Sequence, residues 1–267
     1  MSFTLGPALL FCPADRPERY VKATERADAV ILDLEDAVAP RDKSAAREAL
    51  VAHPLDPART IVRVSQAGTD DHELDLAALA DTEYRHVMLA KASSPRDLDS
   101  LDDYAVLAIC ESAAGVVNAA AIAARDCVVG LMWGAEDLVA SLGGSSSRGG
   151  DGRYRDVAAH ARSTVLLAAS AYGKAAIDAV HLDIADTAGL SAEARDAAAV
   201  GFAATACIHP DQVATVRAAY APGHEELLFA REVLAAAEQE RGVFAFRGRM
   251  VDEPVLVQAR RVLARGE

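Results

Sequence analysis

The sequence predicts an eight-stranded β/α barrel, the (β/α)8 or TIM-barrel class, followed by a C-terminal helical extension. Three observations favour this fold. The chain has 267 residues, close to the roughly 250 that such a barrel needs. Short apolar runs rich in β-forming residues alternate with polar or Gly/Pro residues and then with stretches of helical periodicity. No change in composition marks a linker, and eight such units favour a closed barrel over an open doubly wound sheet.

Eight apolar runs are expected to form the strands. Each is apolar on both faces, as parallel strands covered by helices are, and the stretches between them have room for crossover helices. The runs span residues 8–12, 29–33, 60–64, 86–89, 105–110, 128–133, 179–183 and 204–208.

The longest gap between strands separates the sixth from the seventh. It holds a glycine- and serine-rich segment, residues 143–152, and then a helical pattern over 154–172. Because this segment follows the carboxyl end of a strand, it lies on the face where barrels carry their active sites. Two interpretations are open: a lid or anion-binding loop, and a surface loop without a role in function.

The chain is acidic, with a formal net charge of −13 at pH 7. Such a field repels phosphate backbones and anionic lipid surfaces, so we expect no nucleic-acid and no membrane partner. The N-terminus lacks a basic stretch followed by an apolar one, and no apolar run reaches about 18 residues, so neither export nor membrane insertion is predicted. Four widely spaced cysteines form no C-x-x-C pair, which favours a reducing cytoplasm.

The barrel is expected to occupy residues 1–210, and residues 211–267 are expected to form the C-terminal extension. Helical patterns near and within this extension span 210–220, 224–239 and 254–264. We expect the extension to pack on the barrel or on a neighbouring subunit.

Acidic residues gather at the carboxyl ends of the expected strands, where parallel barrels place their chemistry. Carboxylates at one barrel mouth repel one another unless a cation pairs with them, and a divalent metal would be such a cation. The residues are Asp33, Glu35 and Asp36 at the second strand, Glu111 after the fifth, Glu136 and Asp137 after the sixth, and Asp183 and Asp186 at the seventh.

Glu111 and Asp137 are the predicted metal ligands, because the strands before them are neighbours in a barrel. Oxygen-only ligands indicate a hard cation, and a site with few carboxylates that leaves room for substrate and water suits Mg²⁺ better than Ca²⁺. The alternative is that each residue only caps the helix that follows it. For either residue considered alone, the sequence does not decide between metal binding and helix capping.

Three basic residues stand at other strand ends. Arg63 lies inside the third apolar run, where its charge needs an anionic partner: either a structural carboxylate, or a carboxylate or enolate oxygen of a substrate. Lys91 follows the fourth strand, and an ion pair with the mouth carboxylates is favoured there over a Schiff base. His209 follows the eighth strand and is interpreted as a structural histidine in a tight turn rather than as a base.

Motifs of several common enzyme classes are missing from the chain. No strand is followed by G-x-G-x-x-G, and G-x-x-x-x-G-K-[ST], G-x-S-x-G and H-E-x-x-H do not occur. What remains is a carboxylate-bound metal, a buried arginine and further carboxylates. Such a set can stabilise an enolate while a C–C bond is made or broken.

Seven short motifs carry a family resemblance. They are 11–16 (FCPADR), 33–38 (DLEDAV), 62–64 (VRV), 111–115 (ESAAG), 133–138 (WGAEDL), 208–210 (IHP) and 248–252 (GRMVD). In this order they resemble motifs of the citrate lyase β-subunit and malyl-CoA/citramalyl-CoA lyase family, also known as the HpcH/HpaI aldolase family. The resemblance runs from about Leu9 to Leu263.

The resemblance implies a β/α barrel, a homotrimer, Mg²⁺ as cofactor, and cleavage of a 3-hydroxyacyl-CoA thioester into an acyl-CoA and a 2-oxo acid. By the same resemblance, Glu111 and Asp137 hold the metal and Arg63 contacts the substrate. Arg16 falls where the family contacts substrate near the first strand. Asp252 aligns with an aspartate that a neighbouring subunit supplies as acid or base.

These implications complete the expected site. Glu35 and Asp36 are alternatives to Asp252 as the proton carrier, and Lys91 and Glu111 are expected to contact substrate together with Arg16. Where the family usually has Pro-Lys-x-Glu, this chain has AKAS over 90–93. Two other functions stay open: a metal-dependent aldolase acting on free oxo acids, and a catalytically silent barrel that binds acyl-CoA.

Overall fold

The computed structural model describes residues 3–240 and 242–266. The chain forms two compact units, Met1–Val216 and Arg217–Glu267. The division falls inside helix α9 (Pro210–Tyr220).

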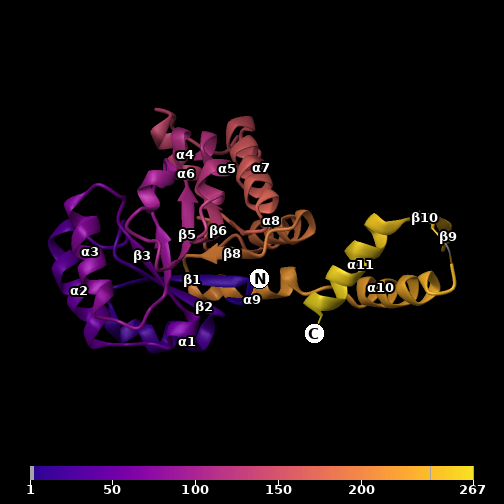
Figure 1. Cartoon of the computed structure of the whole chain (residues 1–267), viewed down its shortest axis with the longest axis horizontal. Coiled ribbons are helices and arrows are strands. Elements are labelled where there is room, and N and C mark those ends of the chain that lie inside the picture. Colours follow the sequence, from indigo (N-terminus) through magenta and orange to yellow (C-terminus); the bar gives the residue numbers. More distant parts are fainter. Residues whose placement is uncertain (1–2, 241, 267) are drawn as a thin grey trace. The chain divides into compact units, whose positions relative to one another are not determined.

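Eight parallel strands close into a barrel in the first unit (Figure 1), which confirms the predicted fold class. Strands that follow one another in sequence pair in the sheet, and β8 pairs back onto β1, with Ala8 opposite Thr205. The strands are β1 (Ala8–Pro13), β2 (Ala29–Asp33), β3 (Thr60–Val64), β4 (His86–Leu89), β5 (Ala105–Cys110), β6 (Val128–Trp133), β7 (Ala175–Asp178) and β8 (Ala204–Cys207).

Helices cover the outside of this barrel, and in Figure 1 α2 and α3 flank the strands on one side and α4 to α7 on another. The connection from β4 to β5 contains the 3₁₀ helix η4 in place of an α-helix. The α-helices are α1 (Tyr20–Arg26), α2 (Lys43–Ala52), α3 (Asp70–Ala80), α4 (Ala113–Val117), α5 (Ala119–Ala123), α6 (Ala135–Ser141), α7 (Asp156–Ala171) and α8 (Thr187–Val200). The 3₁₀ helices, each of which begins at a proline, are η1 (Pro17–Arg19), η2 (Pro40–Asp42), η3 (Pro57–Arg59) and η4 (Pro95–Leu98).

The barrel interior explains why the strands are apolar on both faces. Side chains such as Leu9, Ile31, Met88 and Ile109 form the inner core and are at most 1% exposed, while the outer faces of the strands lie under the helices. Burying one such side chain contributes about 1.5–3 kcal/mol. This packing fixes the strands, and the strands in turn fix the positions of the polar residues at their carboxyl ends.

The seventh strand was predicted wrongly at 179–183. Apolar residues in either half of the stretch 175–183 can supply a strand. The pairing of Gly130 with Ala175 and of Met132 with Ile177 selects the first half. This register places Ile177 in the barrel core. Residues 179–183 form the loop that follows β7 instead.

Asp178 therefore takes the strand-end place that was expected for Asp183. Its carboxylate accepts a hydrogen bond from Trp133 Nε1 at 2.6 Å and pairs with Arg162 at 2.8 Å. Asp186, also expected at this strand, caps helix α8 by accepting a hydrogen bond from the backbone N–H of Gly189.

The glycine- and serine-rich segment between β6 and α7 is held at two points. Ser147 is buried and donates its hydroxyl to the Glu136 carboxylate at 2.5 Å. Arg148 pairs with Glu193 of α8, and its guanidinium carbon lies 3.8 Å from the centroid of the Tyr154 ring. The segment is thus anchored both to the first turn of α6 and to α8.

The second unit contains the predicted C-terminal helices together with a hairpin that was not predicted. Helices α10 (His224–Ala237) and α11 (Glu253–Arg265) share an apolar core with the hairpin strands β9 (Phe244–Phe246) and β10 (Arg249–Val251). The two turn residues, Arg247 and Gly248, have φ of 48° and 75°, as the tight type I′ turn requires. Strands of three residues carry too short an alternation to be recognised in the sequence.

Within the described residues, no helix is both long enough and apolar enough to cross a membrane.

Candidate active site at the barrel mouth

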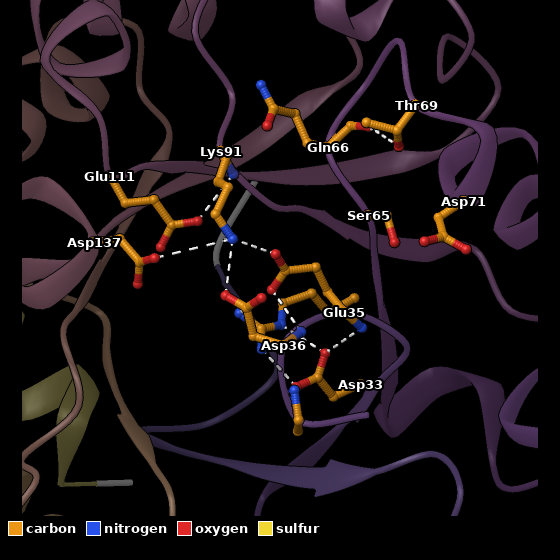
Figure 2. A network of polar contacts seen from close by, with 12 residues as sticks. Asp33, Glu35, Asp36, Ser65, Gln66, Thr69, Asp71, Lys91, Glu111 and Asp137 are labelled. Carbon is orange, nitrogen blue, oxygen red and sulfur yellow. Dashed lines mark hydrogen bonds and ion pairs between the residues drawn. The ribbon is translucent and has the colours of Figure 1, made fainter. Parts of the chain in front are cut away.

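The carboxyl ends of β2 to β6 bring their polar residues together, as Figure 2 shows. A cavity of about 220 Å³ opens here. Arg63, Glu111 and Asp137 contribute to its polar wall. Its apolar wall is formed by Phe11, Ile109, Met132, Val180, Leu182 and Ile208.

Glu111 and Asp137, the predicted metal ligands, lie next to each other at this cavity (Figure 2). The Glu111 side chain is 4% exposed. Burial, together with the nearby Asp137 carboxylate, raises the pKa of Glu111 to about 7. Three influences oppose this rise: the backbone N–H of Lys91, which donates to Glu111 Oε1 at 2.9 Å, and the positive charges of Arg63 and Lys91. Burial and the Asp137 carboxylate thus outweigh the neighbouring positive charges at Glu111.

Helix capping does not account for Glu111. In helix α4 the capping side chain is Ser112, which accepts a hydrogen bond from the backbone N–H of Gly115. Asp137 lies in the first turn of α6, after the N-cap residue Gly134, where a carboxylate interacts favourably with the helix dipole. That position does not prevent it from facing the cavity.

The donor set fits Mg²⁺. Carboxylate oxygens are hard ligands, and Mg²⁺ is commonly held by one or two carboxylates while substrate and water fill its other positions. The described residues contain no group of three or more His, Cys, Asp and Glu side chains placed to hold a metal. A cation held by Glu111 and Asp137 would therefore keep coordination positions open for a substrate.

Gly134 makes room for the Glu111 side chain. A Cβ atom at this position would lie 2.7 Å from Glu111 Oε2, closer than real Cβ contacts come, and 3.0 Å from Glu111 Cβ, which is tighter than most. The glycine in the motif WGAEDL is thus explained by the close approach of Glu111.

Replacing Gly134 with alanine is therefore expected to push Glu111 aside and to weaken Mg²⁺ binding about tenfold or more. Overpacking of this kind also costs roughly 1–3 kcal/mol of stability. Isothermal titration with Mg²⁺ and thermal melting measure the two effects. Gly150→Ala is the matched control, because a Cβ there meets nothing within 4 Å; equal Mg²⁺ affinity in both variants would contradict this role of Gly134.

Arg63 has a structural partner. Its Nε donates to Asp33 Oδ1 at 2.7 Å and its Nη2 to Asp33 Oδ2 at 2.5 Å, while Nη1 lies 3.1 Å from a carboxylate oxygen of Glu35. Burial works against the charge of Arg63, but these carboxylates outweigh it and raise the pKa of Arg63 above its ordinary value. Arg63 also lines the cavity, so the ion pair leaves it accessible to a bound molecule.

Asp33 is a candidate site residue whose partner the sequence alone does not give. It is fully buried and, besides binding Arg63, accepts hydrogen bonds from the backbone N–H groups of Glu35 and Ala37. The pairing of β2 with β3 places Asp33 directly opposite Arg63. The available signal in the sequence was an acidic residue at the end of one apolar run and a basic residue next to the end of the following run.

Lys91 joins the carboxylates of the mouth, as the ion-pair interpretation predicts. Its Nζ donates to Asp36 Oδ2 at 2.8 Å, pairs with Glu35, and lies 3.9 Å from Asp137 Oδ1. Burial opposes its charge, yet the hydrogen bonds to Asp36 and Glu35 raise the pKa of Lys91 above its ordinary value. A lysine held in its charged form is a poor Schiff-base nucleophile.

The two carboxylates that pair with Lys91 differ in environment. Burial raises the pKa of Glu35, although Arg63 and Lys91 act in the opposite direction. Asp36 is more exposed; burial alone would raise its pKa, but the hydrogen bond from Lys91 brings it below the ordinary value. Glu35 therefore accepts a proton more readily than Asp36 does.

Arg16 and His209 make contacts outside this network, and Asp252 is described within the second unit. Arg16 follows β1, and its mostly exposed side chain has its Nε 3.5 Å from Asp15 Oδ2. His209 accepts a hydrogen bond from the backbone N–H of Asp211 at 3.2 Å, in agreement with its structural interpretation. Asp252 belongs to the second unit and stands at the N-cap of α11, where its side chain accepts no capping hydrogen bond from the described residues.

Fold and site together define a β/α-barrel protein with a carboxylate-rich mouth, and comparison with known proteins gives its family. The chain belongs to the HpcH/HpaI aldolase/citrate lyase family, whose model matches residues 8–210. This confirms the family resemblance found in the sequence.

Three relatives illustrate the similarity. The chain is 62% identical over 260 residues to a citrate lyase subunit beta-like protein of Mycobacterium tuberculosis, covering 97% of this chain and 95% of that protein. It is 30% identical over 286 residues to human mitochondrial citramalyl-CoA lyase, covering 94% and 83% of the two chains. The crystal structure of CitE from M. tuberculosis with magnesium, acetoacetate and coenzyme A superimposes with a TM-score of 0.95, at 61% identity and 98% coverage of both chains.

Proposed function

We propose that this protein is a Mg²⁺-dependent carbon–carbon lyase that cleaves or forms a 3-hydroxyacyl-CoA, such as citramalyl-CoA or malyl-CoA. The products of cleavage are an acyl-CoA and a 2-oxo acid. The observation that carries the proposal is the adjacent pair Glu111 and Asp137 at a cavity that Arg63 also lines. The relatives crystallised with magnesium and coenzyme A, or with magnesium and pyruvate, support the same chemistry.

Glu111 and Asp137 would hold the cation. When bound, Mg²⁺ supplies a Lewis acid that lowers the pKa of a coordinated hydroxyl and stabilises charge on oxygen. Arg63, fixed by Asp33, then presents its remaining guanidinium edge to the carboxylate or to the developing oxyanion, for which its planar shape is suited.

A carboxylate of the chain moves the proton. In cleavage it takes the hydroxyl proton, the oxygen becomes a carbonyl, and the C–C bond breaks with its electron pair left on the acyl-CoA as an enolate. Protonation of the enolate carbon completes the reaction. Glu35 has the environment of a proton acceptor, Asp36 is its neighbour, and Asp252 is the alternative from the second unit.

The remaining assignments are part of the same proposal. Arg16 contacts the substrate near β1, Lys91 lies at the edge of the substrate site, and the protein acts as a cytoplasmic homotrimer without nucleic-acid or membrane partners.

A panel of thioesters tests the proposed reaction. Malyl-, citramalyl-, 3-hydroxy-3-methylglutaryl- and citryl-CoA are assayed with Mg²⁺ and again after its removal with EDTA. We expect turnover of at least one thioester, lost with EDTA and restored by Mg²⁺. Cleavage of a free hydroxy acid without coenzyme A would establish the aldolase alternative. Binding of acyl-CoA without any turnover would establish a catalytically silent barrel.

Asp252 is expected to act in the site of a neighbouring subunit. Mixing inactive Glu111→Ala and Asp252→Ala proteins, under conditions where subunit exchange is demonstrated by mass spectrometry, should restore part of the activity. The reason is that some sites then combine an intact Glu111 with an intact Asp252 of a neighbour. Exchange without any recovery of activity would show that Asp252 acts within its own chain or not at all.

A further inference from the structure

Lys91 has an unusual backbone conformation. Its φ is 54°, and among the described residues other than glycine only Arg247 also has a positive φ. Arg247 lies in a two-residue hairpin turn, which demands that conformation, whereas Lys91 follows a barrel strand. A glycine would adopt this conformation freely, and a lysine does so at a cost. Strained residues of this kind concentrate at functional sites, so the lysine side chain has a use here.

The conformation lets one residue bind two groups of carboxylates. The main-chain N–H of Lys91 donates to Glu111 Oε1 at 2.9 Å, on the proposed metal side of the mouth. The side chain reaches the other way, to Asp36 at 2.8 Å and to Glu35. Figure 2 shows Lys91 between the two groups. Ala90 and Ala92, which flank it, are both buried.

We propose that Lys91 is a positioning residue with two separable parts, an inference that rests on the proposed function. The main-chain N–H engages Oε1 of Glu111 and so leaves Oε2 for the cation. The ammonium group holds Glu35 and Asp36 at the same mouth, where a proton must be moved. The left-handed backbone is what allows both parts to work at once.

Removing the ammonium group and displacing the backbone should change the Mg²⁺ affinity in opposite directions. The ammonium group lies 3.9 Å from Asp137 Oδ1 and therefore competes with a cation for that carboxylate. Removing the ammonium while keeping the backbone should strengthen Mg²⁺ binding. Displacing the backbone should weaken it, because Glu111 loses its hydrogen bond. A residue that only stabilised the fold would produce no such difference.

Asparagine, alanine and valine at position 91 separate the two parts. All three remove the ammonium group, but they differ in backbone preference: asparagine tolerates a positive φ, alanine less so, and a β-branched valine resists it. Mg²⁺ is titrated into each folded variant by calorimetry, and kcat and KM are measured with the thioester that the wild type turns over fastest. Circular dichroism and thermal melting establish folding, and Lys91→Ala provides the second comparison if Lys91→Val does not fold.

We expect Lys91→Asn to bind Mg²⁺ more tightly than the wild type, by up to about tenfold, and Lys91→Val to bind it at least about tenfold more weakly, with Lys91→Ala between them. In all three, kcat should fall about 100-fold or more, with a smaller change in KM.

Equal Mg²⁺ affinities across the folded variants would overturn the backbone part, and an unchanged kcat in Lys91→Asn would overturn the side-chain part. A wild type that binds Mg²⁺ but turns over no thioester would contradict the proposed reaction and leave the affinity comparison decisive. A wild type that binds no Mg²⁺ would overturn the metal site and this inference together.

Discussion

Replacing Asp137 or Glu111 with alanine is expected to lower turnover of the best thioester by about 1,000-fold or more and to abolish its dependence on Mg²⁺. Loss of a ligand removes the Lewis acid from the reaction, a contribution of several kcal/mol to transition-state stabilisation. The fold should survive, because both carboxylates lie at the barrel mouth and not among the core side chains. Steady-state kinetics over a range of Mg²⁺ concentrations and calorimetric titration measure the loss.

Asp103→Ala is the matched control. Asp103 is an exposed aspartate that precedes β5, at the opposite end of the barrel from the mouth. Its replacement should leave both Mg²⁺ affinity and turnover unchanged. Wild-type Mg²⁺ dependence in Asp137→Ala would remove Asp137 from the ligand set.

Replacing Arg63 with alanine is expected to destabilise the barrel strongly. The side chain of Asp33 is 1% exposed, and removal of its partner leaves a buried, unpaired carboxylate, which costs about 3–5 kcal/mol. For a unit of this size, that loss corresponds to a fall of roughly 10 °C in Tm. Thermal melting measures it, and Arg96→Ala, at an exposed arginine of η4, should melt close to the wild type.

A double-mutant cycle separates the structural part of Arg63 from its part in the reaction. Asp33→Asn removes the charge that Arg63 neutralises, so Arg63→Met should destabilise this variant much less than it destabilises the wild type. Arg63→Lys keeps the charge but not the planar fork; it should melt only slightly earlier, while kcat/KM falls about 100-fold. Additive effects of Arg63→Met and Asp33→Asn would show that the ion pair contributes nothing, and near-normal kcat/KM in folded Arg63→Lys would limit Arg63 to a structural role.

Most of the fold could be predicted because its signals are local. The apolar runs at β2, β3, β4, β5 and β6 coincide with the strands, since each is bounded by residues that end it. The seventh strand could not be placed in the same way, because apolar residues occur in both halves of the stretch 175–183 and only the pairing with β6 selects Ala175–Asp178. The β9–β10 hairpin was not predicted for a related reason, because its strands depend on packing against α10 and α11.

The residues of the candidate site could be predicted from the sequence, but the contacts between them could not. The rule that barrels place chemistry at the carboxyl ends of strands was enough to select Glu111, Asp137, Arg63 and Lys91. The sequence left open whether Arg63 binds a structural carboxylate, and the register of β2 against β3 supplies Asp33. The contact between the Lys91 N–H and Glu111 depends on a backbone angle that residue identity does not reveal.

The single tryptophan of the chain provides an optical signal for events at the mouth. Trp133 ends β6, is fully buried, and lies four positions before Asp137, with its ring edge against Tyr154 at 5.1 Å between centroids and its N–H bonded to Asp178. Because every photon of indole fluorescence comes from this one position, its emission spectrum and quenching report on the end of β6 alone. Titrations of metal and thioester can therefore be followed on the unlabelled protein, and rapid mixing would resolve the order in which they bind.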